Sequence, residues 1–202
     1  IYLASFIPDI LMRHDSLFSR QAWEYLSWWH ASSYNYHAQL TATHPYGSDW
    51  WTWAITLRPV WLYFKSPIPG TVVGMVEIGN VVTWMAGLGA LIASFFVLKT
   101  TTPEKRSRNI FLTMTYLALY LPWISISRVK FIYHYFMPAL ILLIFLAIIF
   151  DEQVFKTKKY WWIGVGILLA GAAFFIYFIP LLIGLPISQN FYQQHMWLRR
   201  WI

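Results

Sequence analysis

Long apolar runs separated by short polar connections fill the second half of the chain. Four of these runs contain no Asp, Glu, Lys or Arg, and each is close to the roughly 20 residues that cross a hydrocarbon core. They predict transmembrane helices over residues 80–98, 110–126, 131–150 and 161–185. A further apolar piece, residues 1–11, carries Pro8 and Asp9 and is too short to cross a bilayer. We interpret it as the end of a truncated transmembrane helix.

The segment before the first long run has two different patterns. From residue 16 to residue 40, apolar or aromatic side chains recur at helical spacing, which predicts a helix lying in the membrane interface; they are Phe18, Ala22, Leu26, Trp29, Tyr36 and Leu40. Residues 60–64 and 71–78 are rich in β-branched and aromatic side chains, and Pro67, Pro69 and Gly70 separate them. This second pattern predicts a short β-hairpin.

The patterns together predict an all-α integral membrane protein with four transmembrane helices, the end of a fifth, an outer interfacial helix and a short β-hairpin. The chain divides into the helix end at 1–11, an outer-face loop segment at 12–79, a four-helix transmembrane region at 80–185 and an outer-face tail at 186–202.

Composition narrows the class of protein. The chain is 58% hydrophobic and only 11% charged, with a mean hydropathy of +0.49, which excludes an ordinary soluble domain. The formal net charge is +7, but the basic residues lie in short connections rather than along one polar face, so nucleic acid is not a predicted partner. The absence of cysteine excludes disulfides and thiolate metal ligands.

The distribution of Lys and Arg predicts the orientation in the membrane. Two connections between long runs are strongly basic and are placed on the cytoplasmic side; they hold Lys99, Lys105, Arg106 and Arg108, and Lys156, Lys158 and Lys159. The order of the spans then puts residues 12–79, 127–130 and the segment from 186 onward outside. The outer side also holds basic residues, namely Arg128, Lys130, Arg199 and Arg200. Lys and Arg are therefore more densely placed in the cytoplasmic connections, rather than much more numerous there.

The segment from His44 to Trp61 is too polar to cross a bilayer and too aromatic for an ordinary solvated loop. Indole and phenol rings are stable at the headgroup level, where the ring is buried and its N–H or O–H stays hydrated. We therefore interpret the segment as a structured loop at the membrane surface.

Several motifs of uncommon residues resemble one known family. They are His44-Pro45-Tyr46-x-Ser48-x-Trp50-Trp51-x-Trp53, Arg58-Pro59-Val60-Trp61, Gly79-Asn80, Leu121-Pro122-Trp123, Arg128 and Phe131-x-Tyr133-His134-Tyr135. In this order they resemble the C-terminal four-span region of the protein O-mannosyltransferases, integral membrane enzymes of the GT-C superfamily. Eukaryotic members of that family carry a soluble sugar-binding insert just before this region, whereas here the helix end at residues 1–11 leads directly toward the His-Pro-Tyr motif, which favours the bacterial type. The resemblance covers essentially the whole chain. Ala54, Val81 and Met85 depart from the family pattern, where proline, proline and tryptophan are expected.

The resemblance implies transfer of mannose from a polyprenyl-phosphate carrier to Ser or Thr of an acceptor protein, on the outer face of the plasma membrane. The family's catalytic Asp-Glu pair lies in an upstream loop and has no counterpart here, so no catalytic residue is predicted in this chain. Asp151 and Glu152 follow a span on the predicted cytoplasmic side and are interpreted as a topological boundary. The implied partners are the lipid-linked donor, the acceptor protein, membrane lipids and the missing N-terminal half of the enzyme.

The candidate substrate-binding residues each have a plainer alternative. Arg58 and Arg128 can bind the carrier phosphate or anchor the chain at lipid headgroups. His134, three residues into an apolar run, can lie near the phosphate or bond a neighbouring helix. His44 can contact substrate or brace the loop.

The tryptophans of the loop, Trp50, Trp51 and Trp53, can stack on a sugar or peptide or belong only to the interfacial belt. Tyr46 and Ser48, with Asp49, can line the site or only shape the turn. His30 and His37 share a helical face without a nearby carboxylate, so no metal site is predicted, and no cofactor is expected beyond the donor substrate.

Other classes of protein remain open from the residues. A transporter or channel fits four spans, although such proteins place ionisable residues or paired helix breaks at mid-membrane. A non-catalytic membrane subunit and another GT-C transferase, such as an aminoarabinose transferase, are further alternatives. The sequence leaves open the acceptor, the carrier length, the metal requirement and the oligomeric state.

Overall fold

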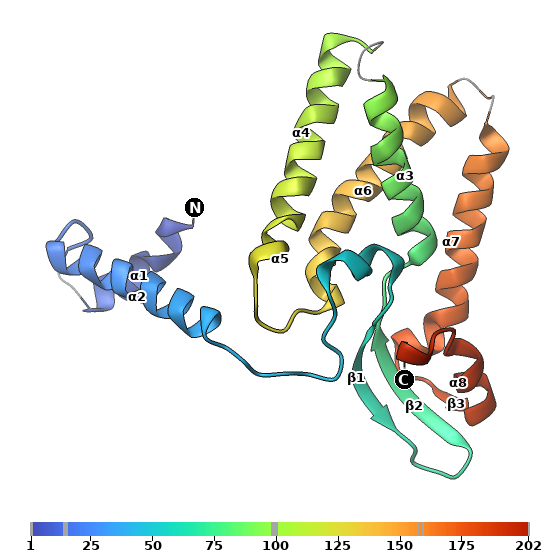
Figure 1. The fold of residues 1–202 in the computed structure, drawn as a ribbon, viewed down its shortest axis with the longest axis horizontal. Coiled ribbons are helices and arrows are strands. Elements are labelled where there is room, and N and C mark those ends of the chain that lie inside the picture. The colour runs from blue at the N-terminus through green and yellow to red at the C-terminus, as the bar shows by residue number, and fades with distance from the viewer. Residues whose placement is uncertain (1, 14–15, 98–100, 157, 159, 202) are drawn as a thin grey trace. The chain divides into compact units, whose positions relative to one another are not determined.

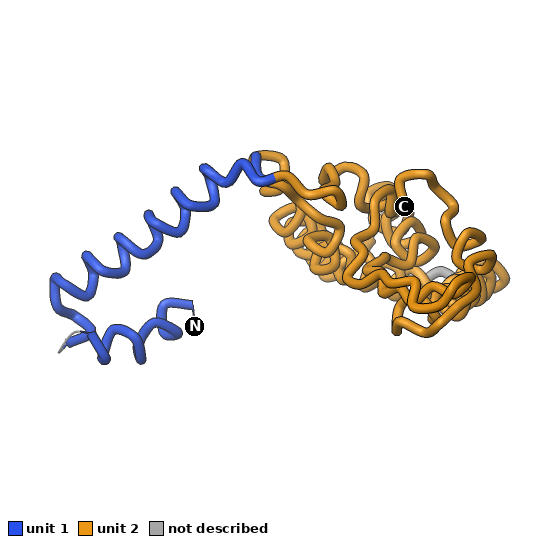
Figure 2. The backbone as a smooth tube through the Cα atoms, turned by 90° about the horizontal axis from the view of Figure 1, so that it is seen from below, with its two compact units in different colours: residues 1–42, 126–128 blue, residues 43–125, 129–202 orange. Residues whose placement is uncertain are grey.

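The computed structural model describes residues 2–13, 16–97, 101–156, 158 and 160–201. Contacts divide the chain into two units, one of residues 1–42 with 126–128 and one of residues 43–125 with 129–202 (Figure 2). The division falls inside the predicted outer segment 12–79. Lys99 and Lys159, which contributed to the predicted orientation, lie outside the described residues.

The first unit is a pair of helices. A 3-10 turn, η1 (Leu3–Phe6), leads into α1 (Ile7–Arg13), and α2 (Arg20–Ala38) follows. The Ser19 hydroxyl accepts a hydrogen bond from Ala22 N at 3.1 Å and so caps α2. Ile10 packs against Ala22 and Leu26 in a small core. The helix predicted over residues 16–40 is present as α2, and its location in the membrane interface stays a prediction. Phe18, Trp29 and Tyr36 of its apolar stripe are exposed.

Four long helices run side by side in the second unit (Figure 1). They are α3 (Val81–Val97), α4 (Pro103–Tyr120), α6 (Phe136–Ile149) and α7 (Trp161–Leu182). Helix α6 packs against α3 and α4, and α3 packs against α7. The core between them includes the fully buried Tyr135, Leu142 and Phe145.

Two helical stretches of the described chain are long and apolar enough to cross a membrane. One is Ile132–Glu152, formed by η3 (Ile132–Tyr135), α6 and the π-helix η4 (Phe150–Phe155), and the other is α7. The apolar part of α3, Val81–Phe96, is shorter, and α4 begins with charged residues. Of the four long helices in the second unit, two thus lie in stretches that meet this test among the described residues.

The predicted bounds of the second span, residues 110–126, are wrong. Helix α4 begins at Pro103, because the Thr102 hydroxyl accepts from Lys105 N and Pro103 fits the first turn. It ends at Tyr120, before Pro122, which begins the separate short helix α5 (Pro122–Ser125). Hydropathy follows only the apolar part of a helix, so it missed the polar first turns.

The second unit also holds a three-stranded antiparallel sheet. Strands β1 (Val60–Lys65) and β2 (Thr71–Glu77) form the predicted hairpin, with a bulge between Trp61 and Tyr63. The C-terminal segment from residue 186 supplies a third strand, β3 (Pro186–Ser188), which pairs with β2 in the order β1-β2-β3. After β3 come α8 (Gln189–His195) and the 3-10 turn η5 (Arg199–Trp201). The tail is therefore part of the sheet.

Asn80 connects the sheet to two helices. Its side-chain oxygen accepts from Thr83 N at 3.2 Å at the start of α3, and its side-chain nitrogen donates to Gly171 O of α7 at 2.8 Å. A Cβ at Gly171 would lie 2.9 Å from the Thr83 methyl group, so the close approach of α3 and α7 depends on this glycine. The Gly79-Asn80 motif thus fixes where α3 begins after β2.

Candidate functional site

The His-Pro-Tyr segment forms a tight turn. Gly47 N donates to His44 O at 2.9 Å, and Tyr46 N donates to His44 Nδ1 at 3.2 Å. Ser48 N donates to Lys130 O at 2.8 Å, which ties the turn to the segment just before η3. A Cβ at Gly47 would lie 2.9 Å from a Val129 methyl group, so only glycine fits here without a shift. His44 is exposed and braces the turn through its own ring nitrogen.

The three tryptophans of the loop lie in different environments. They belong to the 3-10 helix η2 (Trp50–Ile55), which has about three residues per turn, so Trp50 and Trp53 share a side and Trp51 points elsewhere. Trp53 is 0% exposed, and its Nε1 donates to Ser48 Oγ at 2.9 Å. Trp51 is 59% exposed. Of the three, Trp51 is the most exposed.

His134 is half-buried in an aromatic cluster. Its ring centroid is 4.0 Å from that of Trp123 and 6.0 Å from that of Trp53, with the Trp53 and His134 planes 23° apart. Its Nδ1 lies 2.9 Å from Phe131 O and 3.1 Å from Phe131 N, so its tautomer decides which of the two it bonds. The His134 ring therefore packs between Trp53 of η2 and Trp123 of α5.

The Arg58 side chain contacts the backbone at the start of the loop. Its Nε and Nη2 donate to Pro45 O at 3.2 and 2.8 Å, and its Nη1 donates to Arg200 O. The guanidinium carbon lies 5.7 Å from the centre of the Tyr46 ring, in a cation–π arrangement. These bonds use three of the five N–H donors of the guanidinium, which leaves two for another acceptor.

The structure brings eight of the nine candidate residues into one unit. His44, Tyr46, Ser48, Trp50, Trp51, Trp53, Arg58 and His134 all belong to residues 43–125 and 129–202. Arg128 is half-buried and lies in the segment Ile126–Arg128, which groups with residues 1–42.

Sequence reasoning missed several contacts of the loop. The Tyr120 hydroxyl donates to Trp50 O at 3.0 Å, and the ring of Phe131 lies 5.1 Å from that of His44. Trp123 and Phe131 belong to the motifs that carry the family resemblance, so the sequence already marked these two residues as candidates. The contact with Arg200 lies 142 residues away from Arg58, and no local pattern points to it.

Acidic side chains are few around the loop. Asp49 is exposed, and only its backbone oxygen takes part in the turn, by accepting from Thr52 at 2.7 Å. Glu77 is half-buried at the end of β2, where burial away from water raises the pKa of its carboxyl group. Among the described residues, no group of three or more His, Asp or Glu could hold a metal ion.

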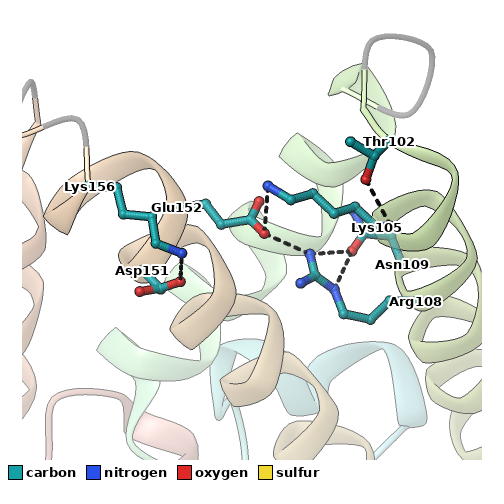
Figure 3. A network of polar contacts seen from close by, with 7 residues as sticks. All are labelled: Thr102, Lys105, Arg108, Asn109, Asp151, Glu152 and Lys156. Carbon is teal, nitrogen blue, oxygen red and sulfur yellow. Dashed lines mark hydrogen bonds and ion pairs between the residues drawn. The ribbon is translucent and has the colours of Figure 1, made fainter.

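At the opposite end of the helices, the adjacent carboxylates are engaged in ion pairs (Figure 3). Glu152 Oε1 lies 3.2 Å from both Lys105 Nζ and Arg108 Nη2 of α4, and Asp151 Oδ2 lies 2.6 Å from Lys156 Nζ. Arg108 also donates to the side-chain oxygen of the buried Asn109. The Glu152 contacts join η4 to α4, whereas the Asp151 contact stays at the end of η4, and both give the pair a structural role.

Two helices that are long and apolar enough to cross a membrane, with an aromatic loop and a small sheet at one end, fit the architecture of a membrane protein. The family model described as the C-terminal four-transmembrane region of protein O-mannosyltransferase matches residues 22–201, so the chain belongs to this family.

Curated relatives and a solved structure agree with this assignment. Polyprenol-phosphate-mannose–protein mannosyltransferases from two strains of Mycolicibacterium smegmatis are 28% identical over 214 residues, covering 96% of this chain and 38% of the relatives. The chain thus spans well under half of their length. The S. cerevisiae protein O-mannosyltransferase Pmt1–Pmt2 complex, bound to the sugar donor, superposes with a TM-score of 0.63 at 23% identity, covering 86% of this chain and 26% of that one. The latter comparison supports the fold.

Proposed function

We propose that this chain is the C-terminal membrane region of an enzyme that transfers mannose from a polyprenyl-phosphate carrier to Ser or Thr hydroxyls of proteins. The observation that carries the proposal is the family match over residues 22–201, together with the relatives named as polyprenol-phosphate-mannose–protein mannosyltransferases. The enzyme is placed in the plasma membrane, with its site on the extracytoplasmic side and with membrane lipids around it.

The reaction is a substitution at the anomeric carbon of mannose. The acceptor hydroxyl forms the new C–O bond and gives up its proton to a base, while the bond to the carrier phosphate breaks and the phosphate leaves. Such a step needs a carboxylate near the hydroxyl and hydrogen-bond donors or cations near the phosphate. We assign the catalytic carboxylate to the part of the enzyme outside this chain, because the upstream Asp-Glu pair that the family resemblance implies has no counterpart here, and the adjacent Asp151 and Glu152 are held in ion pairs.

The loop from His44 to Arg58 supplies a wall of the substrate site. Arg58 keeps two N–H donors beyond its bonds to Pro45 and Arg200, and no described carboxylate pairs with it. A planar cation with free donors suits an oxygen of the carrier phosphate. Trp51, with its exposed ring, suits stacking on the sugar or on an acceptor side chain.

The test separates this chain from the whole enzyme. The chain alone, the upstream part alone and the two co-expressed are purified in nanodiscs and offered polyprenyl-phosphate mannose with a Ser/Thr-rich peptide. Only the combined or full-length enzyme should transfer mannose, because a positioned acid–base group contributes roughly 10²–10⁴-fold. A matched reaction with a different lipid-phosphate sugar controls for donor identity.

Two outcomes contradict the proposal. Full-length enzyme that uses the other lipid-linked sugar and not mannose belongs to a different GT-C activity. Transfer by this chain alone places the catalytic carboxylate within it, and Asp49 beside the tryptophans is then the first residue to replace.

A further inference from the structure

Three hydrogen bonds join η5 to the start of β1 and to the loop of residues 44–58, here called the His-Pro-Tyr loop. Arg58 Nη1 donates to Arg200 O, Trp61 Nε1 donates to Trp201 O at 2.6 Å, and Trp201 Nε1 donates to Thr56 O at 3.0 Å. The two indole bonds are buried, and the residues they join lie 140 and 145 positions apart. Buried hydrogen bonds of this kind leave a desolvated carbonyl unpaired when the donor is removed.

The Arg58 side chain bonds the backbone of both the loop and η5. One edge of its guanidinium bonds Pro45 O through Nε and Nη2, while Nη1 reaches Arg200 O. The planar fork of arginine can bond two carbonyls in fixed directions, whereas the single ammonium of lysine cannot reproduce this geometry. The position of Pro45, and with it that of Tyr46 under the guanidinium, therefore depends on where η5 lies.

Thr56 marks the point where the loop turns into β1. It is fully buried and has φ = 51°, a left-handed conformation that is strained for a β-branched residue. Such a conformation persists only where its surroundings fix it. The bond from Trp201 to the Thr56 carbonyl is one of the contacts that fix it, and Arg58 follows two residues later.

Residues 189–201 are in turn anchored on α7. Fully buried His195 has Nε2 2.8 Å from Tyr177 O and Nδ1 2.7 Å from Phe191 O, and its ring stacks on Tyr177 with centroids 4.0 Å apart. The Trp201 ring lies 5.8 Å from that of Phe178. The loop is thus connected through η5 to one end of a long helix.

We propose that this connection, here called the clasp and formed by Arg58, Trp61 and Trp201 with the carbonyls of Pro45, Thr56 and Arg200, positions the His-Pro-Tyr loop for substrate. Trp201 is then a positioning residue of the transfer reaction, which it influences through Thr56 and Arg58 without contacting substrate. The inference rests on the proposed function, since it assigns the loop to the substrate site of a mannosyltransferase.

The experiment uses the full-length enzyme in nanodiscs. Trp201→Phe removes the N–H donor and keeps most of the ring, and Trp162→Phe, at a tryptophan of α7 that is 61% exposed, is the matched control. We measure KM and kcat for polyprenyl-phosphate mannose and for the peptide, and amide hydrogen exchange over residues 44–58. Trp201→Phe should speed exchange in this segment and lower kcat/KM by about tenfold, or ~1.4 kcal/mol, mainly through KM. The control should match the parent in both.

A second variant tests the fork of Arg58. Arg58→Lys keeps the charge but cannot bond Pro45 and Arg200 together, so its exchange over residues 44–58 should rise as in Trp201→Phe. If exchange there stays at the parent rate in both variants, or rises while KM and kcat are unchanged, the clasp does not position the loop. A parent enzyme that transfers no mannose overturns the proposed function instead, and exchange over residues 44–58 still decides whether the clasp holds the loop.

Discussion

The two ends of the helices in the second unit use different chemistry to hold their connections in place. At the end near the sheet, aromatic rings pack around Trp53 and His134, and Arg58 bonds backbone carbonyls. At the other end, Glu152 accepts from two cations of α4 (Figure 3). A carbonyl oxygen orients a cation and leaves its positive charge in place, whereas a carboxylate orients the cation and also neutralises its charge. The difference favours the aromatic end as the place where an anionic substrate binds.

The largest expected effect concerns the sides of the membrane on which the two ends lie. Single cysteines are placed at Ile68, 64% exposed in the hairpin turn, and at exposed Ser107 of α4, in full-length enzyme without other cysteines. An impermeant thiol reagent on intact cells should label Ile68→Cys only, because the basic connections favour the cytoplasm. Both should react after permeabilisation. Labelling of Ser107→Cys alone in intact cells would reverse the proposed orientation.

Two neighbouring tryptophans should separate stability from function at the aromatic end. Trp53→Ala removes a fully buried ring and leaves the Ser48 hydroxyl without its donor, so we expect a loss of about 3–5 kcal/mol in the free energy of unfolding. Trp51→Ala, at an exposed ring, should change stability by about 0.5 kcal/mol or less and still lower transfer. Unfolding in detergent, followed by tryptophan fluorescence, and mannose transfer measure the two effects. Equal destabilisation would mean that Trp51 is also structural.

Substitutions at the charged end should change the stability of the protein and leave its catalytic rate unchanged. Glu152→Gln leaves Lys105 and Arg108 without a counter-ion at a side chain that is 17% exposed, and about 1–2 kcal/mol should be lost. Asp151→Asn, at an exposed pair, should cost about 0.5 kcal/mol or less. Full-length variants corrected for the amount of folded enzyme should keep the parent kcat. A fall in kcat beyond that correction would give this acidic pair a role in the reaction.

Local patterns predicted much of the fold. The hairpin follows from β-branched side chains on both sides of Pro67, Pro69 and Gly70, and its strands lie within one residue of the expected bounds. Helix α7 begins as expected at Trp161 and ends three residues early, after an internal Pro180. The start of α4 was missed although Thr102-Pro103 is itself a helix-start signal, because the apolar run alone was followed.

The candidate site was predictable in its segments but not in its contacts. The aromatic motif identified the loop, yet the difference in burial between Trp51 and Trp53 depends on the three-residue period of η2, which an aromatic run does not reveal. The bonds from residues 58 and 61 to residues 200 and 201 are set by the packing of the sheet against α7. Such long-range contacts leave no periodic signal along the chain.

The smallest expected effect comes from Glu77, a carboxylate at the aromatic end that, unlike Glu152, has no cation beside it among the described salt bridges. Burial raises its pKa above the ordinary 4.5, so folding favours the protonated form. The stability linked to this group is then fully present below pH 4.5 and is lost as pH rises through the higher pKa of the folded state.

Glu77→Gln, which is neutral at every pH, should therefore have a slightly higher Tm than the parent at pH 7, and the difference should vanish near pH 4. Thermal unfolding of both proteins in detergent across this range measures it. Glu24→Gln, at an exposed carboxylate paired with Arg20, is the control and should not gain stability at pH 7. A lower Tm for Glu77→Gln at pH 7 would instead mean that the charged carboxylate has a stabilising cationic neighbour at the loop, and the two ends would then be less different than their contacts indicate.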